Sequence, residues 1–139
     1  MTLKRRVDTA TSERSPRPVC VFLIPVVRDS DRKPHTPLAW RLLQDVLIQT
    51  FGGSSGPEEV LYYRSPEAVP GMWTPGGSES PVEDRSRKYT LAIPRDRVED
   101  LRVVLRRAGN SFDQRVIYLE VAGYAEFVNV HADAGFLDV

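Results

Sequence analysis

The chain has 139 residues, of which 41% are hydrophobic and 27% are charged, as is usual for one globular domain. Its 19 basic and 19 acidic residues give a formal net charge of zero, so no overall field draws it to nucleic acid or anionic membranes. No apolar run is long enough to span a membrane.

Residues 1–17 are rich in Thr, Ser, Arg and Pro and show no hydrophobic period, which predicts a flexible tail. We expect a single α+β domain over residues 18–130 and a second tail over 131–139. No apolar stretch typical of a signal peptide follows the basic start, which favours a cytoplasmic location. The single cysteine, Cys20, excludes an internal disulfide and suits a reducing compartment.

The first half of the domain begins with a continuously apolar run, VCVFLIPVV, over residues 19–27. Its length and β-branched content predict a strand buried on both faces. A polar loop follows, and apolar residues at helical spacing then predict a helix over 37–51. Thr36 can cap this helix, Pro37 suits its first position, and Gly52 can end it.

Two more strands are predicted at 58–64 and 86–93, joined by a Gly-, Pro- and Ser-rich stretch with a short extended piece over 69–73. The strand at 86–93 alternates, so its side chains divide between two faces. One face carries Arg87, Tyr89, Leu91 and Ile93, and the other carries Ser86, Lys88, Thr90 and Ala92.

A second helix is predicted after Pro94, where Asp96 and Glu99 have the spacing of a capping box. Gly109 and Asn110 are expected to weaken or end it. Its apolar stripe consists of Val98, Leu101, Val104, Leu105, Ala108 and Phe112.

Strands are predicted at 115–121 and 124–130, the latter continuing the sheet past a kink at Gly123. The whole order favours a ferredoxin-like βαββαβ sandwich, with two helices on one face of an antiparallel sheet. Because the first strand is apolar on both faces, something must cover the second face. The candidates are the segment 65–73, the C-terminal residues or another subunit, and we expect a homodimer.

Four short motifs support a resemblance: FGG at 51–53, GMW at 71–73, DRSRKY at 84–89 and QRVIYLEV at 114–121. Their pattern resembles that of a set of small bacterial proteins of unknown function. The likeness covers most of the chain beyond the N-terminal tail. It implies the same α+β fold and carries no activity.

A candidate ligand site is indicated by the charged start of the strand at 86–93. Arg87 offers forked donors, and Trp73 and Tyr118 offer flat apolar walls, which would suit an anionic or aromatic ligand. Glu120 lies two residues after Tyr118, and three roles are open to its carboxylate. It faces water, forms an ion pair with a basic residue such as Arg87, or acts as a general base in catalysis.

The alternative interpretation of the same charged stretch is structural. Asp84 and Ser86 have side chains that cap turns or bond the backbone of a hairpin. In that case the charged residues form the solvated end of a sheet.

The sequence predicts neither a metal site nor a cofactor. His35 and His131 have no third ligand nearby, and Cys20 has no spaced partner. The glycine-rich stretch FGGSSG, over 51–56, follows a helix and lacks the lysine of a phosphate loop.

Three functions are weighed. The first is a homodimeric module that binds a small molecule or a protein partner. The second is a dimeric α+β barrel enzyme with its site between sheet and helices, using His35, Trp73, Arg87, Tyr118 and Glu120. The third, RNA binding, is disfavoured because Tyr89 is the only aromatic residue on its strand and the net charge is zero.

Overall fold

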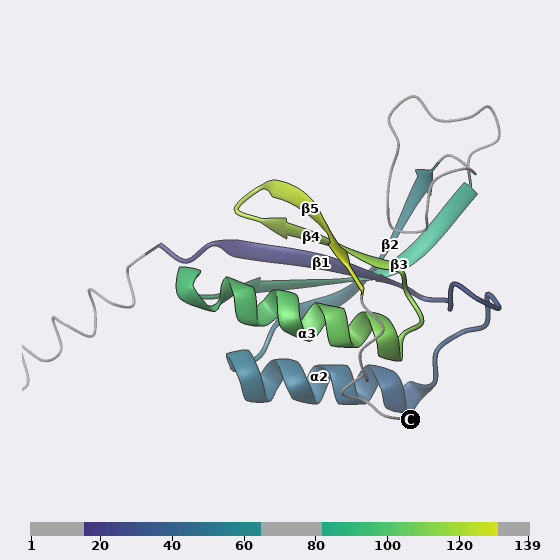
Figure 1. Ribbon diagram of the computed structural model, residues 1–139, viewed down its shortest axis with the longest axis horizontal. Helices are drawn as coiled ribbons and strands as arrows, with labels where there is room; N and C mark the ends of the chain where they lie inside the picture. Colours follow the sequence, from purple (N-terminus) through teal and green to yellow (C-terminus); the bar gives the residue numbers. More distant parts are fainter. Residues whose placement is uncertain (1–15, 65–81, 131–139) are drawn as a thin grey trace, which may run out of the picture.

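The computed structural model describes residues 16–64 and 82–130, which fold into one β-sheet and two α-helices (Figure 1). The expected α+β class is therefore confirmed. In chain order the elements are β1 (Val19–Pro25), α2 (Pro37–Phe51), β2 (Ser55–Arg64), β3 (Val82–Ala92), the 3₁₀ turn η1 (Arg95–Arg97), α3 (Val98–Ser111), β4 (Val116–Val121) and β5 (Tyr124–Asn129). The predicted tails, except for Pro16 and Arg17, and the extended piece at 69–73 lie outside the described residues.

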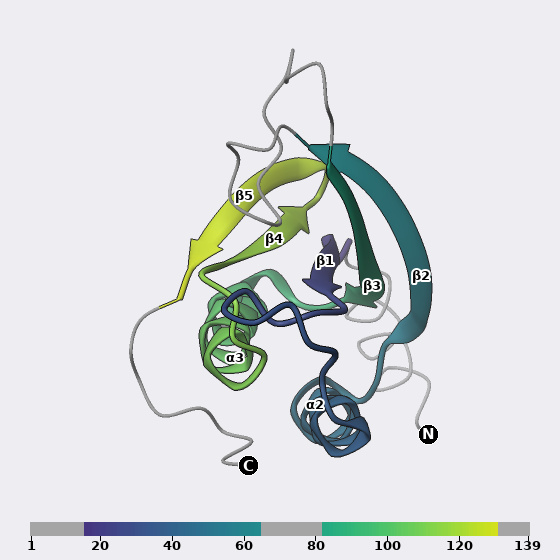
Figure 2. The same cartoon turned by 90° about the vertical axis from the view of Figure 1, so that its right-hand side faces the viewer.

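The sheet is antiparallel, with its five strands in the order β2-β3-β1-β4-β5. Both helices lie on the same side of this curved sheet, as Figure 2 shows. The fifth strand, and the order that results from it, differ from the simple ferredoxin-like plan expected from the sequence.

The extra strand arises at a tight turn formed by Ala122 and Gly123. Their φ angles of 51° and 87° are those of a two-residue hairpin turn. Val121 consequently pairs with Tyr124, and β5 folds back along β4 instead of continuing past a kink. The sequence places the strand correctly but misses the reversal, since Ala-Gly is not one of the usual hairpin dipeptides.

Helix α2 begins and ends as predicted. The Thr36 hydroxyl accepts a hydrogen bond from the backbone N–H of Ala39 at 3.2 Å, and Pro37 occupies the first helical position. Gly52, with φ of 86°, closes the helix by donating its N–H to the carbonyl of Ile48.

Helix α3 begins differently from the prediction. The 3₁₀ turn η1 precedes it, and no side chain caps either segment. The capping box expected from Asp96 and Glu99 is therefore wrong. The carboxylate of Glu99 instead binds Arg102 at 3.3 Å, one turn further along the helix, and Arg106 at 2.9 Å, two turns further along.

The helix also continues through the expected stop at Gly109 and Asn110. Gly109 is buried, and a Cβ built there would overlap the side chain of Val130, placing Cγ1 at 2.9 Å. Val130 is held in place by a hydrogen bond from its N–H to the carbonyl of Arg115. Glycine is thus required at 109 for close packing, not for ending the helix.

One hydrophobic core fills the space between the sheet and the helices. Phe22 of β1 is fully buried and stacks on Tyr89 of β3, with ring centroids 4.9 Å apart. The predicted burial of Cys20 is confirmed, and burial raises the pKa of its thiol. The predicted apolar stripe of α3 is likewise buried throughout.

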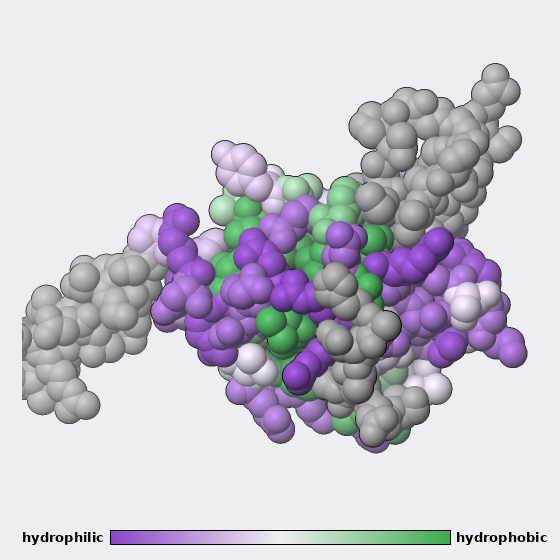
Figure 3. All heavy atoms as spheres, viewed as in Figure 1, coloured by the Kyte–Doolittle hydropathy of each residue, from purple (hydrophilic) through white to green (hydrophobic). Residues whose placement is uncertain are grey.

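The outer surface differs between the two layers. Figure 3 shows hydrophobic residues gathered mainly over the strands, above helices that present mostly hydrophilic residues. Within the described ranges, neither helix is long and apolar enough to cross a membrane.

Strand β3 begins four residues earlier than expected, so the charged stretch lies inside the sheet and not at a turn. Val82 pairs with Arg64 of β2, and Ser86 pairs with Pro25 of β1. Asp84 and Ser86 are almost fully buried in this strand, which contradicts the interpretation of them as turn caps.

Candidate functional site

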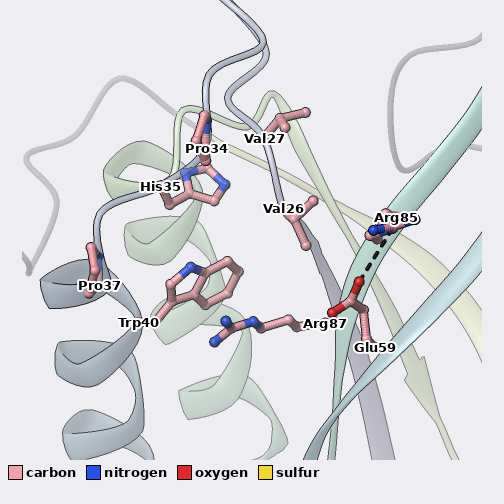
Figure 4. Close-up of a pocket in the computed structure, with 9 residues that line it drawn as sticks. All are labelled: Val26, Val27, Pro34, His35, Pro37, Trp40, Glu59, Arg85 and Arg87. Atoms are coloured by element: carbon pink, nitrogen blue, oxygen red, sulfur yellow. Dashed lines mark ion pairs between the residues drawn. The ribbon is translucent and has the colours of Figure 1, made fainter.

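A cleft of about 510 Å³ opens between the sheet and the first turn of α2 (Figure 4). Five polar or aromatic side chains line it: His35, Trp40, Glu59, Arg85 and Arg87. Glu59 belongs to β2 and the two arginines to β3, where alternate residues share a face. The cleft therefore receives two guanidinium groups from one strand.

Arg87 lies at the centre of the cleft. Its Cα pairs with Ile24 of β1, whose side chain is in the core, so both side chains point toward the helices. The guanidinium carbon lies 4.1 Å from the centroid of the Trp40 ring, as a cation–π pair. Trp40 in turn packs against Phe112 of the core at 4.7 Å. The arginine is thereby held against a fixed aromatic surface.

Arg85 is held less firmly. Its Nε lies 3.3 Å from Oε1 of Glu59, and the two side chains are 53% and 58% exposed. An exposed ion pair of this kind contributes little free energy. Arg85 can therefore exchange Glu59 for an anion of a ligand at small cost.

His35 forms the wall of the cleft beside α2. Its Nε2 lies 2.8 Å from the carbonyl oxygen of Pro25. Because a carbonyl only accepts, Nε2 carries the proton, and Nδ1 is the unprotonated nitrogen of the neutral ring. Burial lowers the pKa of His35, although the hydrogen bond to Pro25 opposes this effect. The imidazole is thus neutral at pH 7.

The lowered pKa of His35 predicts a pH-dependent stability. The unfolded chain takes up a proton near pH 6.5, above the folded pKa, so stability falls as the pH falls below about 6.5. Urea unfolding between about pH 5 and 7 should show this slope, and His35→Gln should reduce it. His131→Gln is the matched control. Equal slopes in the wild type and His35→Gln would contradict the assignment.

The other predicted ligand-binding residues lie elsewhere. Tyr118 pairs with Leu23, next to Ile24 in β1, and therefore points away from the helices and from Arg87. Glu120 shares its face. The suggested pairing of Glu120 with Arg87 is thus wrong, and Trp73 lies outside the described residues.

Glu126 of β5 pairs with a basic residue of the helix layer. It binds Arg102 of α3 through two hydrogen bonds of 2.7 and 3.1 Å. This bidentate pair fastens the added strand β5 to the helix layer.

Metal-ligating side chains do not gather in the described part of the chain. No group of three or more His, Cys, Asp or Glu residues there has the arrangement to hold an ion. The described residues that line the cleft supply guanidinium, imidazole, carboxylate and aromatic groups.

The fold is similar to that of a phage SAM lyase solved in complex with S-methyl-5'-thioadenosine. The TM-score is 0.51 over 86% of this chain and 95% of that chain, with 11% identical residues. At this identity the likeness concerns the fold alone. No protein-family model and no curated protein matches the sequence.

Three of the polar or aromatic residues of the cleft were not predicted from the sequence: Glu59, Arg85 and Trp40. Trp40 belongs to the helix predicted over 37–51 and stands in its first turn, three residues after Pro37. A large aromatic residue in the first turn of α2 reaches the cleft between this helix and the sheet. The combination of Trp40 with the nearby His35 was the available signal.

Proposed function

We propose that the protein is a small-molecule-binding domain whose ligand combines a flat ring with an anionic group. The observation that carries the proposal is the guanidinium of Arg87 fixed on the Trp40 ring inside a cleft of about 510 Å³. Such a volume lies within the range of small-molecule sites. The paired rings and guanidinium groups provide one surface for stacking and another for charge.

The comparison of folds supports the flat ring of this ligand, and the two arginines of the cleft support its anionic group. The phage SAM lyase of similar fold binds S-methyl-5'-thioadenosine, a molecule with a flat adenine ring. An adenine could stack beside Trp40 and His35, and Arg85 and Arg87 would bind an anion attached to the sugar. Adenosine 5'-monophosphate (AMP) is therefore a suitable probe, and adenosine is its uncharged counterpart.

The test uses the fluorescence of Trp40. Because the chain has two tryptophans, Trp73→Phe leaves Trp40 as the only indole emitter. Titration of this variant with AMP should change its emission at lower concentrations than titration with adenosine. Adding Arg87→Met should weaken AMP binding by about 10- to 100-fold, the loss expected for a charge-assisted contact.

Arg107→Met is the matched control, since Arg107 is exposed on α3 and does not line the cleft. Circular dichroism verifies that each variant is folded. Equal affinities for AMP and adenosine, or an Arg87→Met variant that binds AMP like the control, would contradict the proposal.

A second candidate function is an enzyme with its site in this same cleft. The observation that favours it is His35, which is neutral at pH 7 and has an unprotonated Nδ1, as a general base requires. Incubation with AMP or S-methyl-5'-thioadenosine, followed by mass spectrometry, distinguishes the two. Turnover supports the enzyme, and full recovery of both compounds argues against it.

We also infer a homodimer, as expected from the two-faced apolar strand. Leu61 and Tyr63 are exposed on β2, which is an edge strand among the strands of the described residues and thus a candidate for pairing with a second copy. Native mass spectrometry at micromolar concentration should give twice the chain mass, and Leu61→Lys should shift it toward the monomer. A wild-type monomer would refute the dimer.

A further inference from the structure

A second cavity, of about 290 Å³, lies on the face of the sheet opposite the helices. Its apolar lining consists of Val21 and Leu23 of β1, which form the floor between Lys88 and Glu120, and of Val60 and Leu61 of β2. Lys88 of β3 borders it on one side, and Tyr118 and Glu120 of β4 border it on the other. Because side chains alternate along a strand, this cavity is separate from the cleft that contains Arg87.

The cavity carries one positive and one negative group on opposite sides of β1. Lys88 and Tyr118 both pair with Leu23, and Glu120 pairs with Val21. Neighbouring strands lie about 4.8 Å apart and residues rise about 3.4 Å along a strand, so the backbones of Lys88 and Glu120, two strand spacings and two residues apart, stand about 12 Å apart. Among the interactions of the described residues, no ion pair joins these two side chains.

Tyr118 orients the negative group. Its hydroxyl donates to Oε2 of Glu120 at 3.2 Å, and its ring lies at the cavity wall. Burial raises the pKa of Tyr118, and the charge of Glu120 raises it further. The phenol therefore remains a donor at neutral pH, and the carboxylate keeps its position above the apolar floor.

We propose that this cavity binds a zwitterion with an apolar side chain, such as a free apolar α-amino acid. The ligand ammonium binds Glu120, its carboxylate binds Lys88, and its side chain packs on Val21 and Leu23. The volume lies at the lower limit for small-molecule sites, which suits a ligand of this size. This site goes beyond the proposed ring-binding function and is independent of it.

Isothermal titration calorimetry with L-leucine tests the proposal. Isoamylamine is leucine without the carboxylate, and 4-methylpentanoate is leucine without the ammonium. Each should bind at least about tenfold more weakly than L-leucine, because each loses one charge-assisted contact. Absence of L-leucine binding at millimolar concentration would overturn the proposal.

Two variants assign the charges. Lys88→Met should abolish the preference for L-leucine over isoamylamine, and Glu120→Gln should abolish its preference over 4-methylpentanoate. Lys33→Met and Glu83→Gln, at exposed positions outside the cavity, are the matched controls and should leave both preferences unchanged. Preferences that persist in the Lys88 and Glu120 variants, with circular dichroism showing folded proteins, would overturn the assignment.

Titrating AMP into the same samples separates this proposal from the proposed function. If the wild-type protein binds L-leucine but not AMP, the result supports the zwitterion site of the 290 Å³ cavity and contradicts the proposed ligand of the Arg87 cleft. Binding of AMP without binding of L-leucine would support the proposed ligand of the Arg87 cleft and refute the zwitterion site.

Discussion

Phe22→Ala should lower the free energy of unfolding by about 3–5 kcal/mol, the usual cost of emptying a buried aromatic position. Phe22 is fully buried in the central strand, and its ring stacks on Tyr89 with an interplanar angle of 10°. Its removal takes away apolar burial and leaves a cavity that the flanking strands cannot close. Since a domain of this size has a stability of about 5–15 kcal/mol, the variant should be marginally folded. Urea unfolding followed by circular dichroism measures the change.

Val19→Ala provides the comparison within the same strand. Val19 is 50% exposed and points to the opposite face, so its truncation should change stability by less than about 0.5 kcal/mol. If the two truncations cost similar amounts, the core would not lie on the helix side of β1.

Gly109→Ala should destabilise the protein although alanine is the better helix former. The intrinsic gain on replacing glycine in a helix is at most about 1 kcal/mol. The new methyl group would overlap both methyl groups of Val130, with Cγ1 at 2.9 Å, and the Val130 backbone N–H is hydrogen-bonded to the carbonyl of Arg115. Forced overpacking of this kind costs about 1–3 kcal/mol, which should exceed the gain. Thermal or urea unfolding gives the net change.

Val130→Ala should reverse the sign of this effect. In that background the obstructing methyl groups are absent, and Gly109→Ala should become neutral or stabilising. The difference between the two backgrounds is the coupling energy of the pair. A Gly109→Ala variant that is as stable as the wild type when Val130 is present would show that the helix and the end of β5 are not in close contact.

The sequence predicts β1 and α2 well because local signals alone determine them. The apolar run of β1, the cap at Thr36 and the glycine at 52 need no partner from elsewhere in the chain. The start of α3 was misassigned because the Glu99 carboxylate binds Arg102 and Arg106, one and two turns further along the helix, and does not cap the backbone. The role of Gly109 was misassigned because glycine is needed there to make room for the side chain of Val130, which is distant in sequence.

The candidate site was harder to predict because it depends on register. Tyr118, Glu120 and Arg87 look equivalent along the chain, but pairing with Leu23, Val21 and Ile24 sends them to different faces. A shift of one residue exchanges the faces, and periodicity alone does not fix it. The contact between Trp40 and Arg87 could not be predicted from the sequence, because it depends on the packing of α2 against β3.

The central position of β1 has a consequence for how the molecule opens. From Cys20 to Leu23 this strand is paired on both sides, whereas β2 and β5 each have one neighbour. Amide hydrogens of β1 should therefore exchange with solvent only in the rarest, global openings, and those of the edge strands in frequent local ones. The cavity opposite the helices is built on Val21 and Leu23 of β1, and the cleft includes Val26 and Val27, which directly follow this strand. Fraying at either edge therefore leaves one wall of each cavity intact.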